Sequence, residues 1–81
     1  RLAVVDSADN LIGYLGDNLP VVRAAGWPNN LDDTGTPVRT SLLEPGKFNS
    51  PHGLTVDNAG NIYVAEWLIG GRITKLERVN V

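Results

Sequence analysis

The chain has 81 residues, of which 42% are hydrophobic and 20% charged, and its formal net charge is −2. This composition is ordinary for a globular β protein and differs from that of a disordered chain. No apolar run approaches the roughly 20 residues of a membrane helix, so we expect no membrane span. No two of the seven basic residues are adjacent, which argues against nucleic-acid binding, because that binding relies on clustered Lys and Arg.

The chain contains no cysteine. A single core of this size is marginal, and small free-standing domains tend to add disulfides or metals. We therefore expect adjoining structure to supply the missing stability. The absence of cysteine leaves the redox compartment undetermined, because an oxidising location permits disulfides without requiring them.

Residues 1–16 predict two short strands. Arg1–Asp6 is the first, and a second follows at about Leu11–Leu15. Asp6–Asn10 between them has the composition of a tight turn, in which Asp and Asn side chains bind local backbone groups. We expect these residues to be the outer strands of one sheet.

Residues 17–50 are predicted to be a long irregular insertion. This stretch holds four of the five prolines, and only Val21–Ala25 is expected to be ordered by itself. Loops of this length are usually functional or mobile. Trp27 either folds back over the neighbouring sheet or is presented to a partner, and Asp32 and Asp33 carry solvated charge. These three are the candidate partner-contact residues of the loop.

Residues 51–81 predict three short strands, at Leu54–Val56, Asn61–Trp67 and Arg72–Leu76. The connections Asp57–Gly60 and Gly70–Gly71 are tight turns, and their residues tolerate positive φ, which favours antiparallel neighbours. No helical crossover fits between these strands, so parallel α/β folds are excluded.

The middle strand of this group is apolar on both faces. Ile62 and Val64 point to one side of the pleat, while Tyr63, Ala65 and Trp67 point to the other. Such a strand is expected where both faces of the sheet are covered, as in a propeller blade. Replacing Ile62 or Tyr63 with Ala is therefore expected to cost roughly 2 to 5 kcal/mol.

A pattern from the start of the chain returns near its end. Arg1–Asp6 matches Arg72–Glu77 as basic, apolar, small, variable, apolar and acidic. Propeller blades repeat at roughly 40 to 50 residues. The two copies lie further apart than that, and we assign the excess to the insertion.

Three stretches, Phe48–Asp57, Gly60–Glu66 and Gly71–Leu76, together resemble an NHL repeat, the blade unit of a six-bladed β-propeller. Residues 1–16 resemble the back half of the preceding blade. The resemblance implies an all-β propeller segment of four-stranded antiparallel blades in an incomplete ring, with Glu66 where the family usually has Asp. The chain would then begin and end inside a blade, and we expect an excerpt, a proteolytic piece, or a fragment built to assemble with copies of itself.

His52 is the only histidine, and the resemblance places it at the mouth of the central channel. Histidine at such a place suits a metal ligand or an acid/base group, because the imidazole side chain can serve both roles. In peptidyl-hydroxyglycine α-amidating lyases, which share the NHL propeller, histidines of several blades hold zinc at this kind of position. One ligand from one blade makes no site, and the alternative is a histidine that bonds backbone.

Other polar residues have a structural and a functional interpretation. Asp57 followed by Asn61 could bind calcium, but the loop lacks the further carboxylates that calcium needs, and a local turn explains the residues. Glu66 and Arg72 lie on strands that pair, as a substrate carboxylate clamp or as an ion pair between strands. Tyr63 and Trp67 share a face and suit packing against a neighbouring blade.

The leading functional hypothesis is a binding or scaffold module for a protein or small ligand, acting through its loop face. The first alternative is part of a zinc-dependent lyase or hydrolase with His52 as one ligand, so the sequence leaves open whether the protein is an enzyme. The second alternative is a fragment that assembles into a closed propeller of identical chains. Neighbouring blades are the expected partners, and the resemblance favours a bacterial periplasmic or extracellular location.

Overall fold

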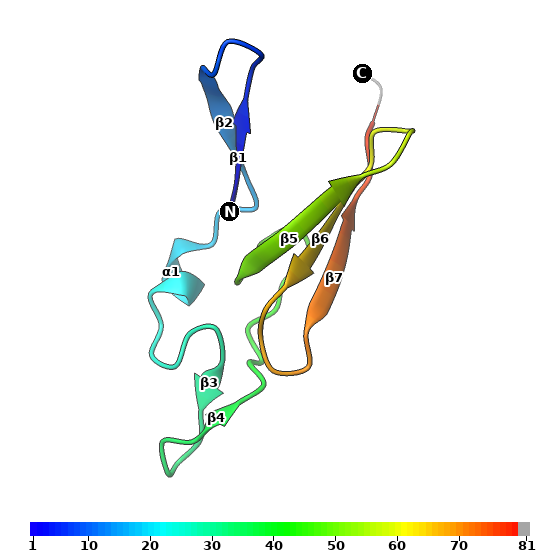
Figure 1. The fold of residues 1–81 in the computed structure, drawn as a ribbon. Coiled ribbons are helices and arrows are strands. Elements are labelled where there is room, and N and C mark those ends of the chain that lie inside the picture. The colour runs from blue at the N-terminus through cyan, green and yellow to red at the C-terminus, as the bar shows by residue number, and fades with distance from the viewer. Residues whose placement is uncertain (80–81) are drawn as a thin grey trace.

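The computed structural model describes residues 1–79, and its regular secondary structure is almost entirely β (Figure 1). Small antiparallel sheets, separated by loops, make up the described part of the chain. No helix within residues 1–79 is long and apolar enough to cross a membrane. The elements are β1 (Leu2–Val5), β2 (Leu11–Leu15), α1 (Leu19–Val22), β3 (Asn30–Leu31), β4 (Pro37–Val38), β5 (Pro51–Val56), β6 (Ile62–Glu66) and β7 (Arg72–Leu76).

The C-terminal sheet has three antiparallel strands in the order β5-β6-β7. Ile62 of β6 lies opposite Val56 of β5 on one side and Leu76 of β7 on the other. The three strands expected from the sequence are confirmed. The first of them begins earlier than expected, at Pro51, with an irregularity in the register before Gly53.

The first two strands form a separate hairpin, β1–β2, with an irregularity in the register between Val4 and Val5. Leu2 and Val4 are half-buried and face the C-terminal sheet across a pocket that also contacts Leu54 and Ile62. The opposite side of the hairpin carries Ala3, Ile12 and Tyr14, which are exposed. We call these three residues the outer face of the hairpin.

The insertion contains more regular structure than the sequence predicts. A single helical turn, α1, lies at residues 19–22 and overlaps the segment 21–25 that was expected to be ordered. It is followed by the hairpin β3–β4, each strand of which has two residues. The hairpin escaped prediction because strands of two residues carry no periodicity. Asp32 and Asp33 belong to its loop, where Asp32 accepts bonds from Thr34 and Thr36.

The three hairpin loops of residues 6–10, 32–36 and 57–61 share one hydrogen-bond pattern. In each, the carboxylate of the opening Asp accepts from the amides two and four residues later, at 2.9 to 3.0 Å. The amide of the same Asp donates to the carbonyl four residues later. The fourth loop position has positive φ in every case, and it is occupied by Asp9, Gly35 and Gly60.

These local bonds explain the Asp residues of the loops without a metal ion. They hold the pKa of Asp6, Asp32 and Asp57 below its usual value, chiefly through bonds from the Asn10 backbone, the Thr34 side chain and the Asn61 side chain respectively. Asp57 also accepts a bond from the Tyr63 hydroxyl at 3.0 Å. Every loop closes itself, so each hairpin is specified by its own sequence.

Phe48 and Val64 are the fully buried apolar side chains of the described chain. The Phe48 ring lies against Gly16, where a Cβ would sit 2.3 Å from a ring carbon, and the Phe48 amide donates to the Gly16 carbonyl at 3.0 Å. Gly16 has φ +68°, a region that other residues rarely adopt. The end of β2 and the segment before β5 are therefore joined by one buried ring.

The expectation that both faces of the C-terminal sheet are covered is wrong for the chain alone. On one face Val64 is fully buried, whereas Ile73, Thr55 and Ala65 on the other are exposed, Ile73 at 71% of its surface. The chain provides no layer over that second face. We call it the uncovered face, and its residues are Gly53, Thr55, Tyr63, Ala65, Ile73 and Lys75.

Candidate functional site

Three segments meet at one end of the C-terminal sheet, which we call the loop end. They are the insertion, the beginning of β5, and the β6–β7 loop of residues 67–71 (Figure 1). The loop 57–61 lies at the opposite end of the sheet. Most of the candidate site residues named from the sequence lie at the loop end, because β5 begins where β6 ends.

Glu66 and Arg72 form the centre of the loop end. Their side chains pair at 2.5 Å, and the Glu66 carboxylate has no exposed surface while Arg72 is 17% exposed. The second Glu66 oxygen accepts from the amides of Asn49 and Ser50, at 2.6 and 3.1 Å. This carboxylate therefore has its partners within the fold, and a role as a substrate clamp would require it to give them up.

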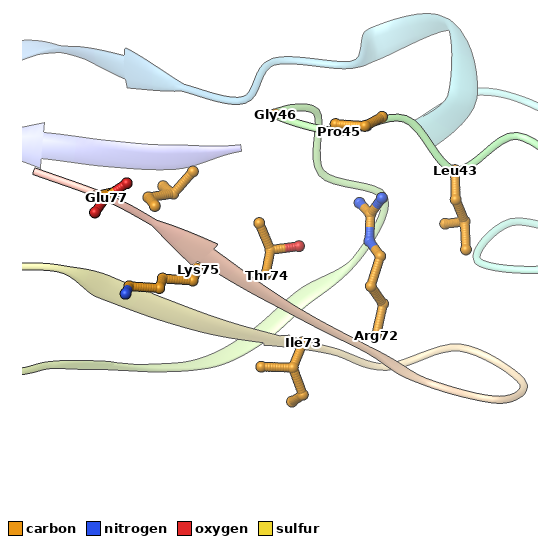
Figure 2. A pocket seen from close by; sticks show the side chains of 9 residues that line it. Leu43, Pro45, Gly46, Arg72, Ile73, Thr74, Lys75 and Glu77 are labelled. Carbon is orange, nitrogen blue, oxygen red and sulfur yellow. The ribbon is translucent and has the colours of Figure 1, made fainter.

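Arg72 extends this network into the insertion. Its two terminal nitrogens donate to the carbonyls of Glu44 and Lys47, at 3.0 and 2.6 Å. Figure 2 shows the side chain reaching from β7 toward the segment that carries Pro45 and Gly46. A planar guanidinium donates from three separate nitrogens and so reaches a carboxylate and two carbonyls at once, whereas a lysine serves all its acceptors from a single nitrogen.

Competing effects set the pKa of Glu66. Burial raises it, and the bonds from Arg72, Asn49 and Ser50 together outweigh burial, so the pKa lies below its usual value. The group is therefore ionised at neutral pH. Its ionised form stabilises the fold, because only a carboxylate can accept from all three partners at full strength.

A groove of about 670 Å³ runs along β7, between this strand and residues 43–46 (Figure 2). Figure 2 shows Arg72 and Thr74 on one side of β7 and Ile73 on the other, and all three line the groove. The groove is shallow and open, and it follows the free edge of the sheet, since β7 pairs only with β6 in the described residues.

The insertion is fastened to the β6–β7 loop by polar side chains. Arg39 donates to the carbonyls of Ile69 and Gly71, both at 3.1 Å. The Asn29 side chain accepts from the Ile69 amide at 2.8 Å. The loop is thus held on both sides by residues that lie 30 or more positions earlier in the chain.

Trp27 folds back onto the sheet side of the insertion. Its indole nitrogen donates to the Asn49 carbonyl at 2.9 Å, yet 44% of the residue stays exposed. Trp27 is therefore anchored at its nitrogen and accessible on part of its ring. Asp33 lies exposed in the loop of the β3–β4 hairpin.

His52 lies near the start of β5 and is exposed. Its ring is 6.5 Å from the Trp67 ring, centroid to centroid, at a tilt of 36°. Residues 1–79 contain no group of three His, Cys, Asp or Glu side chains that could hold a metal. A zinc ion at His52 would need further ligands from outside this chain.

The segment that carries Glu66 and His52 also has a family match. The family model of the NHL repeat matches residues 48–67. No curated protein and no solved structure matches the chain. The chain is an all-β segment with an NHL repeat, small antiparallel sheets and almost no helix, in agreement with an incomplete NHL-type propeller segment.

Two residues of the loop end escape the sequence analysis, Asn29 and Arg39. Both lie in the insertion, outside the NHL repeat, and both act on backbone atoms of residues 69–71. Local pattern cannot reveal bonds between segments so distant in sequence. The only trace of the Arg39 contact in the sequence is the glycine at position 70. The structure explains this glycine, since a Cβ there would lie 2.0 Å from an Arg39 nitrogen.

Proposed function

We propose that the chain is a propeller-type binding module and that its loop end contacts a protein partner. The observation that carries this proposal is the fastening of the insertion to the NHL repeat and its following loop. Trp27, Asn29, Arg39 and Arg72 each bind backbone across that boundary. A surface fixed before binding loses less conformational entropy when a partner arrives.

The smaller of the two hollows described at the loop end suits a side chain of a protein partner better than a small ligand. A pocket of about 180 Å³ lies between the insertion and the β6–β7 loop. Pockets for small ligands usually measure about 300 to 1,000 Å³, so this one suits a single side chain of a larger partner. Trp67 beside it is 70% exposed, and tryptophan is enriched among residues that dominate interface energies. Its lining residues are Pro28, Asn29, Trp67, Leu68 and Ile69.

We further infer that the NHL repeat is one blade of a six-bladed ring, with β1–β2 as the outer half of the preceding blade. The match of Arg1–Asp6 to Arg72–Glu77 supports this assignment, as do the three-stranded meander and its uncovered face. We expect neighbouring blades to cover this face, because soluble proteins rarely expose a large apolar sheet face and propeller blades cover one another's faces.

A selection from a phage-displayed random peptide library tests the loop end as a binding surface. Peptides selected on the chain should bind Ile69→Lys at least ~10-fold more weakly, which corresponds to the loss of one good interface contact. The matched control is Ile12→Lys, on the outer face of the hairpin, because Ile12 and Ile69 are both exposed. This control should bind the peptides as the unmodified chain does. Equal binding of the peptides to the chain and to Ile69→Lys would overturn the proposal.

The enzymatic alternative, a zinc-dependent lyase or hydrolase, rests on the exposed position of His52 at the loop end. As one ligand it should hold zinc only weakly, since structural and catalytic zinc sites use three or four protein ligands. We expect titration calorimetry of zinc into the chain to show no tight binding. Saturable tight binding that disappears in His52→Ala would instead favour the enzyme.

A further inference from the structure

We propose that the loop end binds a protein segment in which an acidic side chain pairs with Arg39 while a nearby apolar side chain enters the pocket beside Ile69. This inference rests on the proposed function and deepens it, because it names the chemistry of the partner. It gives Arg39 two roles. The guanidinium that holds the β6–β7 loop also presents donors to the partner.

Arg39 holds the β6–β7 loop with a single nitrogen. Its Nη1 donates to the carbonyls of Ile69 and Gly71, both at 3.1 Å. The hydrogen bonds that Arg39 makes within residues 1–79 leave its Nε and Nη2 unused. These two nitrogens form one edge of the planar fork, and such an edge matches the two oxygens of a carboxylate.

The unused edge of Arg39 points away from the loop. A Cβ at Gly70 would approach Nη1 most closely, with Cζ at 3.0 Å and Cδ at 3.2 Å. Nη1 lies on the same side of the guanidinium as Cδ, and the Nε–Nη2 edge lies on the opposite side. Arg39 is also exposed. The side chain therefore rests against the loop at Gly70 and leaves its carboxylate-binding edge accessible.

The positive charge of Arg39 is not compensated by a carboxylate within residues 1–79. The ion pairs in this part of the chain are Arg1 with Asp17, Lys47 with Glu44, and Arg72 with Glu66. Asp32 and Asp33 belong to the hairpin loop that precedes Arg39, and neither pairs with it. Two neutral carbonyls bind the guanidinium without cancelling its charge, so an acidic group of a partner complements this position.

The pocket and the guanidinium adjoin each other through Ile69. Ile69 lines the pocket of about 180 Å³, and its carbonyl is one of the two that Arg39 binds. Asn29 also lines the pocket, and its side-chain oxygen accepts from the Ile69 amide. One short segment of a partner can therefore supply both the apolar side chain and the carboxylate.

A carboxylate suits this position better than a phosphate does. Sites for phosphorylated motifs gather several arginines, whereas the loop end offers the unused edge of one. Arg72, the other arginine there, is committed to Glu66 and to the carbonyls of Glu44 and Lys47. The occupant that we assign to Arg39 is therefore an Asp or Glu side chain.

Peptides selected on the chain from a random library test the inference. Those that bind Ile69→Lys at least ~10-fold more weakly should share an acidic residue close to an apolar one. Changing that acidic residue to its amide should weaken binding to the unmodified chain about 5- to 10-fold. The same change should alter binding to Arg39→Gln by less than about 2-fold.

Two further measurements separate the lost charge from a disturbed loop. Truncating the apolar residue of the peptide to Ala should weaken binding equally for the unmodified chain and Arg39→Gln, if the pocket persists without Arg39. NMR of the unmodified chain decides the case in which it does not persist. The Nε–H signal of Arg39, assigned by its absence in Arg39→Gln, should shift with the acidic peptide and not with the amide form.

Arg78→Gln is the matched control. Arg78 is exposed, and its side chain lies against Gly60, another glycine of positive φ, beside the loop 57–61 at the opposite end of the sheet. This variant removes the same charge, so the loss caused by the acid-to-amide change should persist in it.

The outcomes distinguish this inference from the proposed function. Peptides that depend on Ile69 but contain no acidic residue would overturn the inference and leave the proposed function in place. An acid-to-amide loss that persists in Arg39→Gln, or an Nε–H signal that the acidic peptide does not shift, would do the same. Peptides that bind Ile69→Lys as well as the unmodified chain would overturn both.

Discussion

Arg1 and Arg72 occupy matching positions of the internal repeat, but their surroundings differ. Arg1 pairs with Asp17 at 3.5 Å, and the two side chains are 47% and 55% exposed. Arg72 pairs with Glu66 at 2.5 Å, and that carboxylate has no exposed surface. Exposed pairs contribute about 0 to 1 kcal/mol, whereas removing one partner of a buried pair costs about 3 to 5 kcal/mol.

The same contrast extends to the two sheets that hold these residues. The C-terminal sheet is tied to the insertion through Glu66, Arg72 and the neighbouring Phe48, and it contains the fully buried Val64. The β1–β2 hairpin has no fully buried side chain among its strand residues. We therefore expect these two similar sequences to differ in stability, because only the C-terminal sheet has a fully buried apolar side chain and a buried polar network.

The largest expected effect comes from breaking the buried pair. Glu66→Gln should lower the free energy of unfolding by about 3 to 5 kcal/mol, because Arg72 is left without its charged partner. Asp17→Asn, which removes the partner of Arg1, should cost less than about 1 kcal/mol. Urea denaturation of both variants measures the difference, and equal losses would show that the burial of Glu66 is unimportant.

The same carboxylate makes stability depend on pH. The pKa of Glu66 is lowered in the folded chain, so its contribution is complete above the unfolded pKa of about 4.3 and is lost as the pH falls through the folded pKa. Urea midpoints measured from about pH 6 downward should fall more steeply for the unmodified chain than for Glu66→Gln. Asp6, Asp32 and Asp57 titrate in the same direction, and they remain in both samples.

A smaller difference is expected between buried and exposed apolar residues of the two sheets. Val64→Ala should cost about 2 kcal/mol, from the loss of two buried methyl groups and the cavity that they leave. Ile12→Ala in the hairpin should cost less than about 1 kcal/mol in dilute solution, because the side chain is already exposed. A large loss at Ile12 under those conditions would mean that the hairpin is covered in a way that the single chain does not show.

The smallest effect concerns the loops of the two sheets. Asp9 has φ 65°, at the position that Gly60 occupies in the loop 57–61. Asp9→Gly should raise the free energy of unfolding by up to about 1 kcal/mol, since a non-glycine residue is disfavoured in this region. The converse change Gly60→Asp should destabilise, and more strongly, because a Cβ there would lie 2.7 Å from the Arg78 side chain. Thermal unfolding of both variants provides the comparison.

Most of the strand structure could be predicted from the sequence. Alternation in residues 62–67 and the glycines of the turns predict the β5–β7 meander, because strand period and turn chemistry are local properties. The β3–β4 hairpin was missed, although Asp32 and Gly35 repeat the spacing of Asp57 and Gly60. A search for this spacing would have found it.

Burial was harder to predict than strands. Two-sided apolarity in β6 suggested a sheet covered on both faces, but the chain fully buries only Val64, and Leu54 and Val56 on the same face are 59% and 55% exposed. Ile62 and Tyr63 are half-buried rather than buried, so the earlier expectation of 2 to 5 kcal/mol applies to Phe48 and Val64 instead. The apolar residues of a strand show that its face can be buried, but whether another part of the protein covers that face is not encoded in the strand itself.

The sequence by itself determined the all-β class, the NHL repeat and the three self-closing loops, since each depends on residues within a few positions of one another. Only the tertiary structure showed that Glu66 accepts from Asn49 and Ser50, and that Asn29 and Arg39 hold the loop 67–71. These bonds join segments about 16 to 40 positions apart, and their partners are backbone atoms, which nearly every residue type provides. No side-chain pattern marks such partners, so the fold alone selects them.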